Sequence, residues 1–383
     1  MLAQHACRPG RGLTCLALLS VWLLGCSSLE QLGKPPVRRA EMPRAIDTVA
    51  FGSCLKAYRE APVFDDILAA SPDVMLMLGD NVYADLPEIP RDRWDYRAKY
   101  DELGEQDYWQ RFRAQVPVLA TWDDHDYGRN DAGVDWWLKE EAKLEYMRFF
   151  NVPARSPMRS REGIYQVSMV GPPGRRVQLI LLDLRTFKDK FDQRLGGVLR
   201  PGGPYVETDD TSRTLMGEAQ WQWLERQLRR PADVRLIASS IQVVAEDHGW
   251  EGWDKFPHER RRLYELLGRT QADGVIFLSG DRHHAEISLD REAMENGAPY
   301  PIWDLTASGL NQSSDNETEF NRHRLGQVYH TTNFGLIHID WSRADPLVTL
   351  QVRGRDGIPF NSQQLRLSEL RPAEGDAAKA AGP

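Results

Sequence analysis

The sequence has few cysteines, no run of lysine or arginine longer than three residues, no internal repeat, and no apolar segment long enough to span a bilayer. Without a basic run we do not expect a nucleic-acid duplex as partner, because duplex binding rests on lysine and arginine contacts with phosphates. The 383 residues carry a formal net charge of -8, an acidic excess that fits a protein gathering cations. Hydrophobic residues make up 41% of the chain, enough for a sizeable core.

The N-terminus has the pattern of a secretory leader. Arg8 and Arg11 precede an apolar stretch at residues 13–24, which is shorter than the ~20 residues of a membrane-spanning helix. The following Gly25-Cys26, with Leu23-Leu24 before it, resembles the processing box of bacterial lipoproteins. This resemblance implies cleavage after residue 25 and a lipid on Cys26. A serine after the cysteine favours the outer membrane, facing the periplasm; the alternative is ordinary secretion with release.

Cleavage would leave Cys54 as a lone thiol in an oxidising compartment. It removes Cys7 and Cys15, and Cys26 is committed to lipid. Unpaired cysteines are unusual in secreted proteins. Most free cysteines behave as small buried hydrophobic residues, but the isolation of Cys54 favours the interpretation that it is a metal ligand.

The hydrophobic pattern predicts one large α/β domain at residues 47–360, after a tether at 26–46 and before a partly disordered tail at 361–383. Strands are predicted at residues 48–52, 74–78, 116–121, 164–170, 177–182, 234–238, 274–278, 285–289, 302–306, 335–341 and 347–352. Helices are predicted around 64–68 and at 94–112, 136–150, 217–228 and 259–267. This order indicates two mixed sheets covered by helices. Residues 187–215 are predicted to form a long loop, of the kind that often covers an active site.

Two apolar runs end abruptly in Gly-Asp, one at residues 75–83 (MLMLGDNVY) and one at 275–284 (VIFLSGDRHH). Buried parallel strands read as such runs, and ligands of open α/β folds bind beyond their carboxyl ends. Asp80 could bridge two cations there, and the phenolate of Tyr83 is a hard donor suited to Fe(III). The alternative is that Asp80 caps a helix and Tyr83 packs in the core. Together the two runs predict a two-metal hydrolytic site.

Asp281 and His283 are two residues apart. On an extended backbone both side chains would point the same way, as two ligands of one site should. His284 would point away and is expected to be structural.

Residues 123–126 (DDHD) place three carboxylates around one imidazole. Like charges this close repel, so a cation would keep them ionised. The alternative is an exposed acidic turn, which the preceding Trp122 disfavours. Farther along, His248 with Glu251 and Asp254 could line a substrate groove or begin a solvated helix.

These segments, in this order, resemble the alkaline phosphatase D (PhoD-like) family of the calcineurin-like metallophosphoesterases. The similar segments are FGSC at 51–54, GDNVY at 79–83, TWDDHD at 121–126, LDLR at 182–185, SSIQ at 239–242 and SGDRH at 279–283. The resemblance covers roughly residues 49–311. It implies a four-layer αββα sandwich with two mixed β-sheets, hydrolysis of phosphate esters, and an Fe(III) site with calcium nearby.

The resemblance also implies a ligand set. By position, the metal ligands would be Cys54, Tyr83 and His283 for iron, Asp80 as the bridge, and Asp124 and Asp281 for the second cation. Carboxylates suit Ca²⁺, which takes oxygen donors. Zinc or manganese would also accept several of these donors, and whether Asp123 shares the role of Asp124 stays open.

The role of His125 also comes from the resemblance, whereas Arg185 and His248 are assigned from their own positions in the sequence. His125 corresponds to the histidine near the leaving group. Arg185 is predicted to clamp the substrate phosphate, with a surface ion pair as the alternative. Gln242 falls where commoner phosphoesterases supply a histidine ligand, and with His248 it is expected to contact substrate.

The predicted function is hydrolysis of phosphodiesters, phosphomonoesters or both, by metal-bound hydroxide in the cell envelope. One alternative is a phospholipase-D-like or cell-wall-polymer phosphodiesterase. Another is a non-catalytic, calcium-stabilised surface lipoprotein. Against the last, calcium binding alone needs neither Cys54 nor His125. The expected partners are a small phosphate ester and, through the lipid anchor, a membrane; no obligate protein partner is evident.

Overall fold

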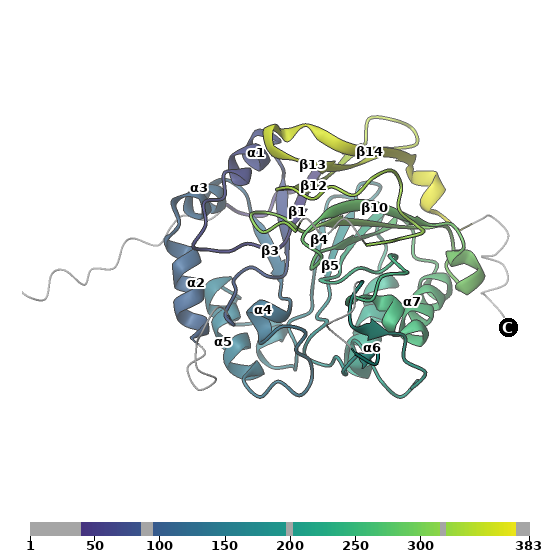
Figure 1. Ribbon diagram of the computed structural model, residues 1–383. Helices are drawn as coiled ribbons and strands as arrows, with labels where there is room; N and C mark the ends of the chain where they lie inside the picture. The colour runs from purple at the N-terminus through teal and green to yellow at the C-terminus, as the bar shows by residue number, and fades with distance from the viewer. Residues whose placement is uncertain (1–39, 86–94, 197–201, 315–318, 373–383) are drawn as a thin grey trace, which may run out of the picture. The chain divides into compact units, whose positions relative to one another are not determined.

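Two six-stranded mixed sheets form the centre of the computed structural model (Figure 1). The structure describes residues 40–85, 95–196, 202–314 and 319–372, which all fall within one compact unit. The expected leader and the lipidation site at Cys26 lie outside these residues, as does most of the tether. Within the described ranges, no helix has both the length and the apolar character that a membrane span requires.

The first sheet has the strand order β14-β13-β12-β1-β2-β3. Its strands are β1 (Thr48–Gly52), β2 (Val74–Leu78), β3 (Val118–Thr121), β12 (Phe334–Asp340), β13 (Leu347–Arg353) and β14 (Pro359–Arg366). Strands β1, β2 and β3 run parallel, and β12, β13 and β14 add antiparallel partners on the β1 side. Every residue of β2 is buried, as expected of a strand covered on both faces.

The second sheet has the order β10-β11-β9-β8-β5-β4. Its strands are β4 (Gln166–Val170), β5 (Val177–Leu181), β8 (Val234–Ala238), β9 (Val275–Ser279), β10 (Ala285–Asp290) and β11 (Ile302–Ala307). The four inner strands run parallel, and β4 and β10 form antiparallel edges. A separate ribbon pairs β6 (Asp192–Gln193) with β7 (Tyr205–Val206).

Alternation along β2 divides the core between the two faces of the first sheet. Leu76 and Leu78 join the apolar cluster shared with the second sheet, whereas Met75 and Met77 join the cluster formed with the helices on the outer side. Successive strand residues point to opposite faces, so one strand serves both layers.

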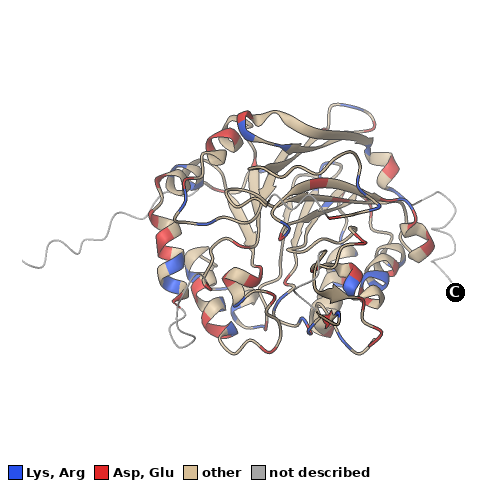
Figure 2. Ribbon diagram, viewed as in Figure 1, with Lys and Arg blue, Asp and Glu red and all other residues tan. Residues whose placement is uncertain are grey.

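The helices lie on the outer faces of the two sheets. Those on the first sheet include α1 (Val63–Ala69), α2 (Tyr96–Glu105), α3 (Asp107–Gln115) and α5 (Lys139–Phe149); on the second are α6 (Gly217–Leu228) and α7 (Pro257–Thr270). Short elements are α4 (Asp124–Tyr127), η1 (Pro157–Arg159), η3 (Trp253–Lys255), η4 (Ala293–Asn296), η5 (Arg355–Gly357) and η6 (Leu367–Leu370). Acidic and basic residues are interspersed along α2, α5 and α7 (Figure 2). The four-layer αββα prediction is confirmed.

The structure departs from the sequence expectations mainly in two helices and at the end of the domain. The helix expected at 94–112 is two helices, because Gln106 between α2 and α3 is extended, with ψ 127°. The helix expected at 136–150 begins at Lys139. The domain boundary expected at residue 360 falls inside β14, so the first sheet and η6 extend into the segment expected to be a tail.

Candidate metal centre

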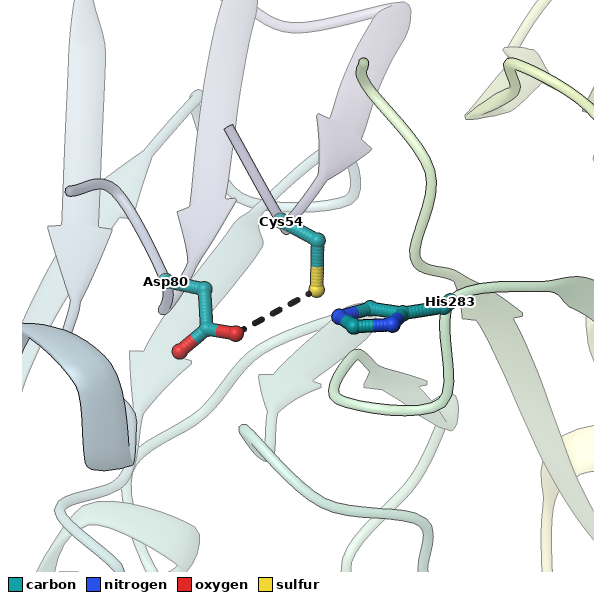
Figure 3. A group of neighbouring side chains, drawn as sticks. All are labelled: Cys54, Asp80 and His283. Atoms are coloured by element: carbon teal, nitrogen blue, oxygen red, sulfur yellow. Dashed lines mark hydrogen bonds between the residues drawn. The ribbon is translucent and has the colours of Figure 1, made fainter. Parts of the chain in front are cut away.

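Strand ends bring Cys54, Asp80 and His283 together (Figure 3). Cys54 follows β1, Asp80 follows β2, and His283 lies beyond β9. One potential ligand atom from each lies within 4.8 Å of the others. The Cys54 Sγ is 3.5 Å from Asp80 Oδ2, and the Tyr83 hydroxyl is 3.1 Å from His283 Nε2. The four residues that the family resemblance implied around iron therefore lie side by side.

The backbone turns sharply at these positions. Cys54, Asp80, Asp281 and His283 have φ of 63°, 49°, 68° and 55°, in the left-handed region that residues other than glycine seldom adopt. The expectation of an extended backbone at Asp281 and His283 is therefore wrong, although both side chains line the same pocket. Left-handed residues clustered at strand ends are typical of functional sites, where the surrounding structure holds the strain.

A group of carboxylates adjoins the first cluster. Ligand atoms of Asp123, Asp124 and Asp281 lie within 4.8 Å of one another, as do those of Asp80, Asp124 and His125. Asp80 thus belongs to both groups, as a bridging ligand would. Asp124 lines the pocket and Asp123 does not, which favours Asp124 as the ligand.

The buried carboxylates of the site place negative charge where bound cations would neutralise it. Burial raises the pKa of Asp80 well above its usual value and that of Asp281 to about 6. Within the described structure, Asp123 Oδ2 is buried without a hydrogen-bond donor. Burial, with the charges of Arg282 and His125, lowers the pKa of His283 to about 3, which keeps the imidazole neutral as a metal ligand requires. Buried carboxylates of this density need positive charge nearby.

His125 is held by a carboxylate that the sequence reasoning missed. Its Nδ1 lies 2.6 Å from Asp85 Oδ1, and its ring centroid lies 4.3 Å from that of Tyr83. Although burial opposes ionisation, the Asp124 and Asp80 carboxylates and the bond to Asp85 raise the pKa of His125 well above its usual value. Asp85 follows the Gly-Asp strand end by five residues, and no motif spacing marks it in the sequence.

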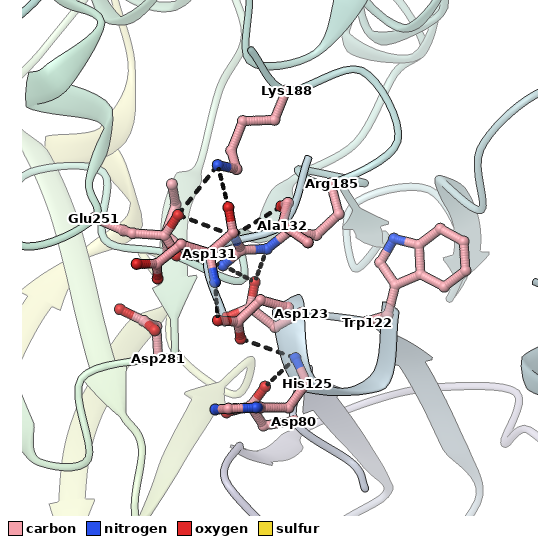
Figure 4. A network of polar contacts seen from close by, with 12 residues as sticks. Asp80, Trp122, Asp123, His125, Asp131, Ala132, Arg185, Lys188, Glu251 and Asp281 are labelled. Atoms are coloured by element: carbon pink, nitrogen blue, oxygen red, sulfur yellow. Dashed lines mark hydrogen bonds and ion pairs between the residues drawn. The ribbon is translucent and has the colours of Figure 1, made fainter. Parts of the chain in front are cut away.

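Arg185 is engaged inside the protein. It is fully buried, and it binds Asp123 through Nε at 2.6 Å and Glu251 through Nη1 and Nη2 at 2.9 and 2.6 Å (Figure 4). Lys188 adds a second cation, 3.3 Å from Glu251. Because its donors are occupied and it does not line the pocket, Arg185 is placed to orient Asp123 and Glu251. It is not placed to clamp a substrate phosphate.

Gln242 and His248 also lie away from the pocket lining. The Gln242 side-chain amide donates to Glu286 at 2.7 Å and to Thr306 at 2.8 Å, inside the protein. His248 is 4% exposed, and its Nδ1 accepts a bond from the Trp250 backbone N–H. Burial lowers the pKa of His248 well below its usual value. These contacts give both residues structural roles.

Asp80, Asp124, Asp281 and His283 line a pocket of about 220 Å³. Arg282 is the only lysine or arginine among the described residues that line it. Its guanidinium binds Glu319 and lies 3.3 Å from Asp281, and it stacks over the Trp250 ring at 4.9 Å. The Asp-Arg-His order at 281–283 could have drawn attention to this arginine, which sits between two predicted ligands.

Comparisons with known proteins identify the family of the chain. The family model described as PhoD-like phosphatase matches residues 49–349. Alkaline phosphatase D of Bacillus subtilis (strain 168) is 24% identical over 206 residues, which cover 49% of this chain and 35% of that protein. The match thus spans only about a third of the relative.

Solved structures resemble the fold. One titled "Structure of PhoD" superposes with a TM-score of 0.59 at 18% identity, covering 88% of this chain and 74% of that chain. A second, "GAP50 the anchor in the inner membrane complex of Plasmodium", gives a TM-score of 0.49 at 10% identity, covering 84% and 89%. At 18% identity the first match shows a shared fold. The second match, with a TM-score below 0.5, supports no conclusion about this chain.

Proposed function

Because the chain belongs to the PhoD-like phosphatase family, we propose that it is a phosphoesterase, which hydrolyses phosphate esters with cations held by the clustered strand-end residues. The observation that carries the proposal is that Asp80, Asp124, His125 and His283 line one pocket, while Cys54 lies behind them, within 4.8 Å of Asp80 and His283. Calcium binding alone would need no thiol and no imidazole, so the set disfavours a non-catalytic lipoprotein.

The donor chemistry fits two different cations. Cys54, Tyr83 and His283 would hold Fe(III), and Asp80, shared by both groups, would bridge to a Ca²⁺ bound by Asp124 and Asp281. Such cations supply a water of lowered pKa and offset charge on the phosphoryl oxygens.

His125 is the proposed general acid. Its Nδ1 is bonded to Asp85, which leaves Nε2 to donate a proton to the alkoxide that leaves phosphorus. The bond to the Asp85 carboxylate favours the protonated ring. General acids typically contribute about 10²–10⁴-fold in rate.

Arg282 is the proposed phosphate-binding residue, in place of Arg185. It lines the pocket, and Glu319 and Trp250 hold its guanidinium in one orientation. Glu319 takes Nε and Nη2, and Asp281 takes Nη1 at 3.3 Å, so the N–H groups left on the two Nη atoms would donate to the phosphate oxygens.

We further propose that Cys26 carries a lipid that anchors the enzyme in the cell envelope, at the outer membrane facing the periplasm. The supporting pattern is the leader that ends at residue 25. Labelling of cells with radioactive palmitate should mark the protein. A Cys26→Ser protein should remain unlabelled; labelling that persists would contradict the proposal.

The catalytic proposal is tested with residues 27–383 and bis-p-nitrophenyl phosphate as substrate. Chelation should abolish turnover, and re-addition of Fe(III) with Ca²⁺ should restore it. His125→Ala should lower kcat by about 10²–10⁴-fold at unchanged metal content. His258, whose Nε2 bonds the Arg213 carbonyl outside the pocket, provides a matched histidine control. Equal turnover before and after metal stripping would refute metal dependence.

A further inference from the structure

A cavity of about 380 Å³ lies at the end of the second sheet opposite the metal centre. It is lined by the turns that lead into strands β5, β8 and β9, which run parallel and begin side by side. Asp281 follows the other end of β9, and the five residues of this strand span roughly 16 Å. Among the described residues, none lines both this cavity and the metal pocket. The two sites are therefore separate.

Arginines outnumber carboxylates around this cavity. Its charged lining residues are Arg176, Arg229, Arg230, Arg235, Asp233 and Asp273. Arg229 is paired with Glu225 at 2.6 Å, which adds a third acid, and the exposed Arg175 and Arg269 adjoin lining residues in the chain. These six arginines and three carboxylates form a surface that we call the arginine face. It is locally basic in a chain whose formal net charge is -8.

Three of these arginines have no carboxylate within ion-pair distance in the part of the chain that the structure describes. Arg176 and Arg230 make no ion pair there, and Arg230 donates to the Gln227 side chain at 3.0 Å. Arg235 is 4% exposed, and the described acceptors of its guanidinium are the backbone carbonyls of Leu228, Arg230, Ala232 and Asp273. Asp233 and Asp273 act on its charge only from a longer distance. The cavity therefore keeps positive charge for a ligand.

The chain joins the described domain at the same end of the molecule. The Ala40 backbone N–H donates to the Arg113 carbonyl at 3.0 Å, near the end of α3 and before the start of β3. Residues 40–47 then lead into the start of β1, whose other end carries Cys54. Because the parallel strands of both sheets end at the metals, both sheets begin at the end that bears the arginine face. A lipid on Cys26, as proposed above, would thus be linked to the domain at this end.

We propose that the arginine face is a membrane-docking surface whose guanidinium groups bind the phosphates of anionic phospholipids. A guanidinium can bind two phosphate oxygens at once, and basic residues close to an anionic leaflet add to the binding free energy. With this face on the bilayer, the metal pocket faces away from the membrane and is open to soluble phosphate esters. Docking goes beyond the proposed catalysis and does not depend on it.

The test measures sedimentation of metal-loaded residues 27–383, which lack the lipid, with two kinds of vesicle. One kind is phosphatidylcholine alone, and the other is an equal mixture of phosphatidylcholine and phosphatidylglycerol. At low salt the protein should bind the anionic vesicles and not the neutral ones. Ionic strength near ~1 M should remove this binding by screening.

Arg176→Ala and Arg230→Ala should each weaken binding to the anionic vesicles by about fivefold, and the double change to glutamate should abolish it. Arg129→Ala provides the matched control, because Arg129 is an exposed arginine next to Asn130 in the lining of the metal pocket. This control should bind as the parent does. Equal sedimentation with both kinds of vesicle, or full binding by the double glutamate variant, would overturn the inference.

Two further measurements separate this surface from other sites. If radioactive inorganic phosphate binds the parent, is lost in the double glutamate variant and no vesicle binds, the cavity is a site for a free anion and the membrane surface is refuted. Turnover of bis-p-nitrophenyl phosphate should be the same with and without saturating anionic vesicles, and a fall on docking would contradict the orientation. Absence of turnover in both conditions would refute the proposed function while leaving vesicle binding as the test of this inference.

Discussion

Replacing Asp85 with asparagine should move the alkaline limit of catalysis to lower pH. Asp85 Oδ1 accepts a bond from His125 Nδ1 at 2.6 Å, and the two side chains are only 9% and 12% exposed. The pKa of His125 is raised by Asp124, Asp80 and this bond, against the opposing effect of burial. A raised pKa keeps the His125 ring protonated up to a higher pH. The general acid is therefore lost as the pH rises through that pKa. Removing the negative charge of Asp85 lowers the pKa of His125. The alkaline limb of the pH profile of kcat then moves to lower pH.

The size of the shift follows from the strength of the bond. A hydrogen bond between charged groups contributes about 1.5–3 kcal/mol. Asparagine keeps a neutral acceptor at the same place, so about half of this should be lost. At 1.36 kcal/mol per pKa unit, the limb should move by about one unit, and kcat above it should fall by about tenfold.

The assay is the pH dependence of kcat for bis-p-nitrophenyl phosphate, measured for the parent, Asp85→Asn and Asp65→Asn. Asp65 is a matched surface carboxylate, 65% exposed and paired with Arg111, and its change should leave the profile in place. An unmoved limb in Asp85→Asn, or an equal loss at every pH, would refute the assignment of His125 as an acid tuned by Asp85.

Three further changes separate binding from structure. Arg185→Met should lower the free energy of unfolding by about 3–5 kcal/mol in denaturant titrations, because Asp123 and part of Glu251 lose their buried counter-charge; a change below 1 kcal/mol would contradict the buried pairing. Arg282→Ala should raise KM for phosphate esters more than Arg282→Lys does, since lysine keeps the charge without the two-oxygen geometry; equal kinetics in parent and both variants would exclude phosphate binding by this residue. Gln242→Ala should lower the thermal midpoint and leave KM unchanged, and a raised KM at parental stability would restore its expected contact with substrate.

The parts of the site that lie at strand ends could be predicted from the sequence. Cys54, Asp80 and Asp281 each follow an unbroken apolar run, and the carboxyl ends of parallel strands share one rim. The chain passes directly from a recognisable strand to the functional side chain. The local sequence pattern is sufficient to predict these residues because few residues separate the strand from the functional side chain.

Features that depend on distant packing could not be predicted in this way. Arg185 also follows a strand, but its partner Glu251 arrives on a loop 66 residues later, so the sequence does not tell a buried ion pair from a phosphate clamp. The edge strand β14 contains Pro359 and a polar run at 361–364. Its pairing with β13 needs little burial, and the hydrophobic pattern therefore does not mark it as a strand.

The most direct test of the central claim is the metal content and diester turnover of the Cys54→Ala protein beside the parent. Both proteins would be stripped, reloaded with Fe(III) and Ca²⁺, desalted and analysed for each metal, with Ser53→Ala as a neighbouring buried control. The account predicts that Cys54→Ala loses iron and turnover together while keeping the parental fold, and that Ser53→Ala retains iron. Full iron content and full turnover in Cys54→Ala would contradict the thiol-containing metal centre.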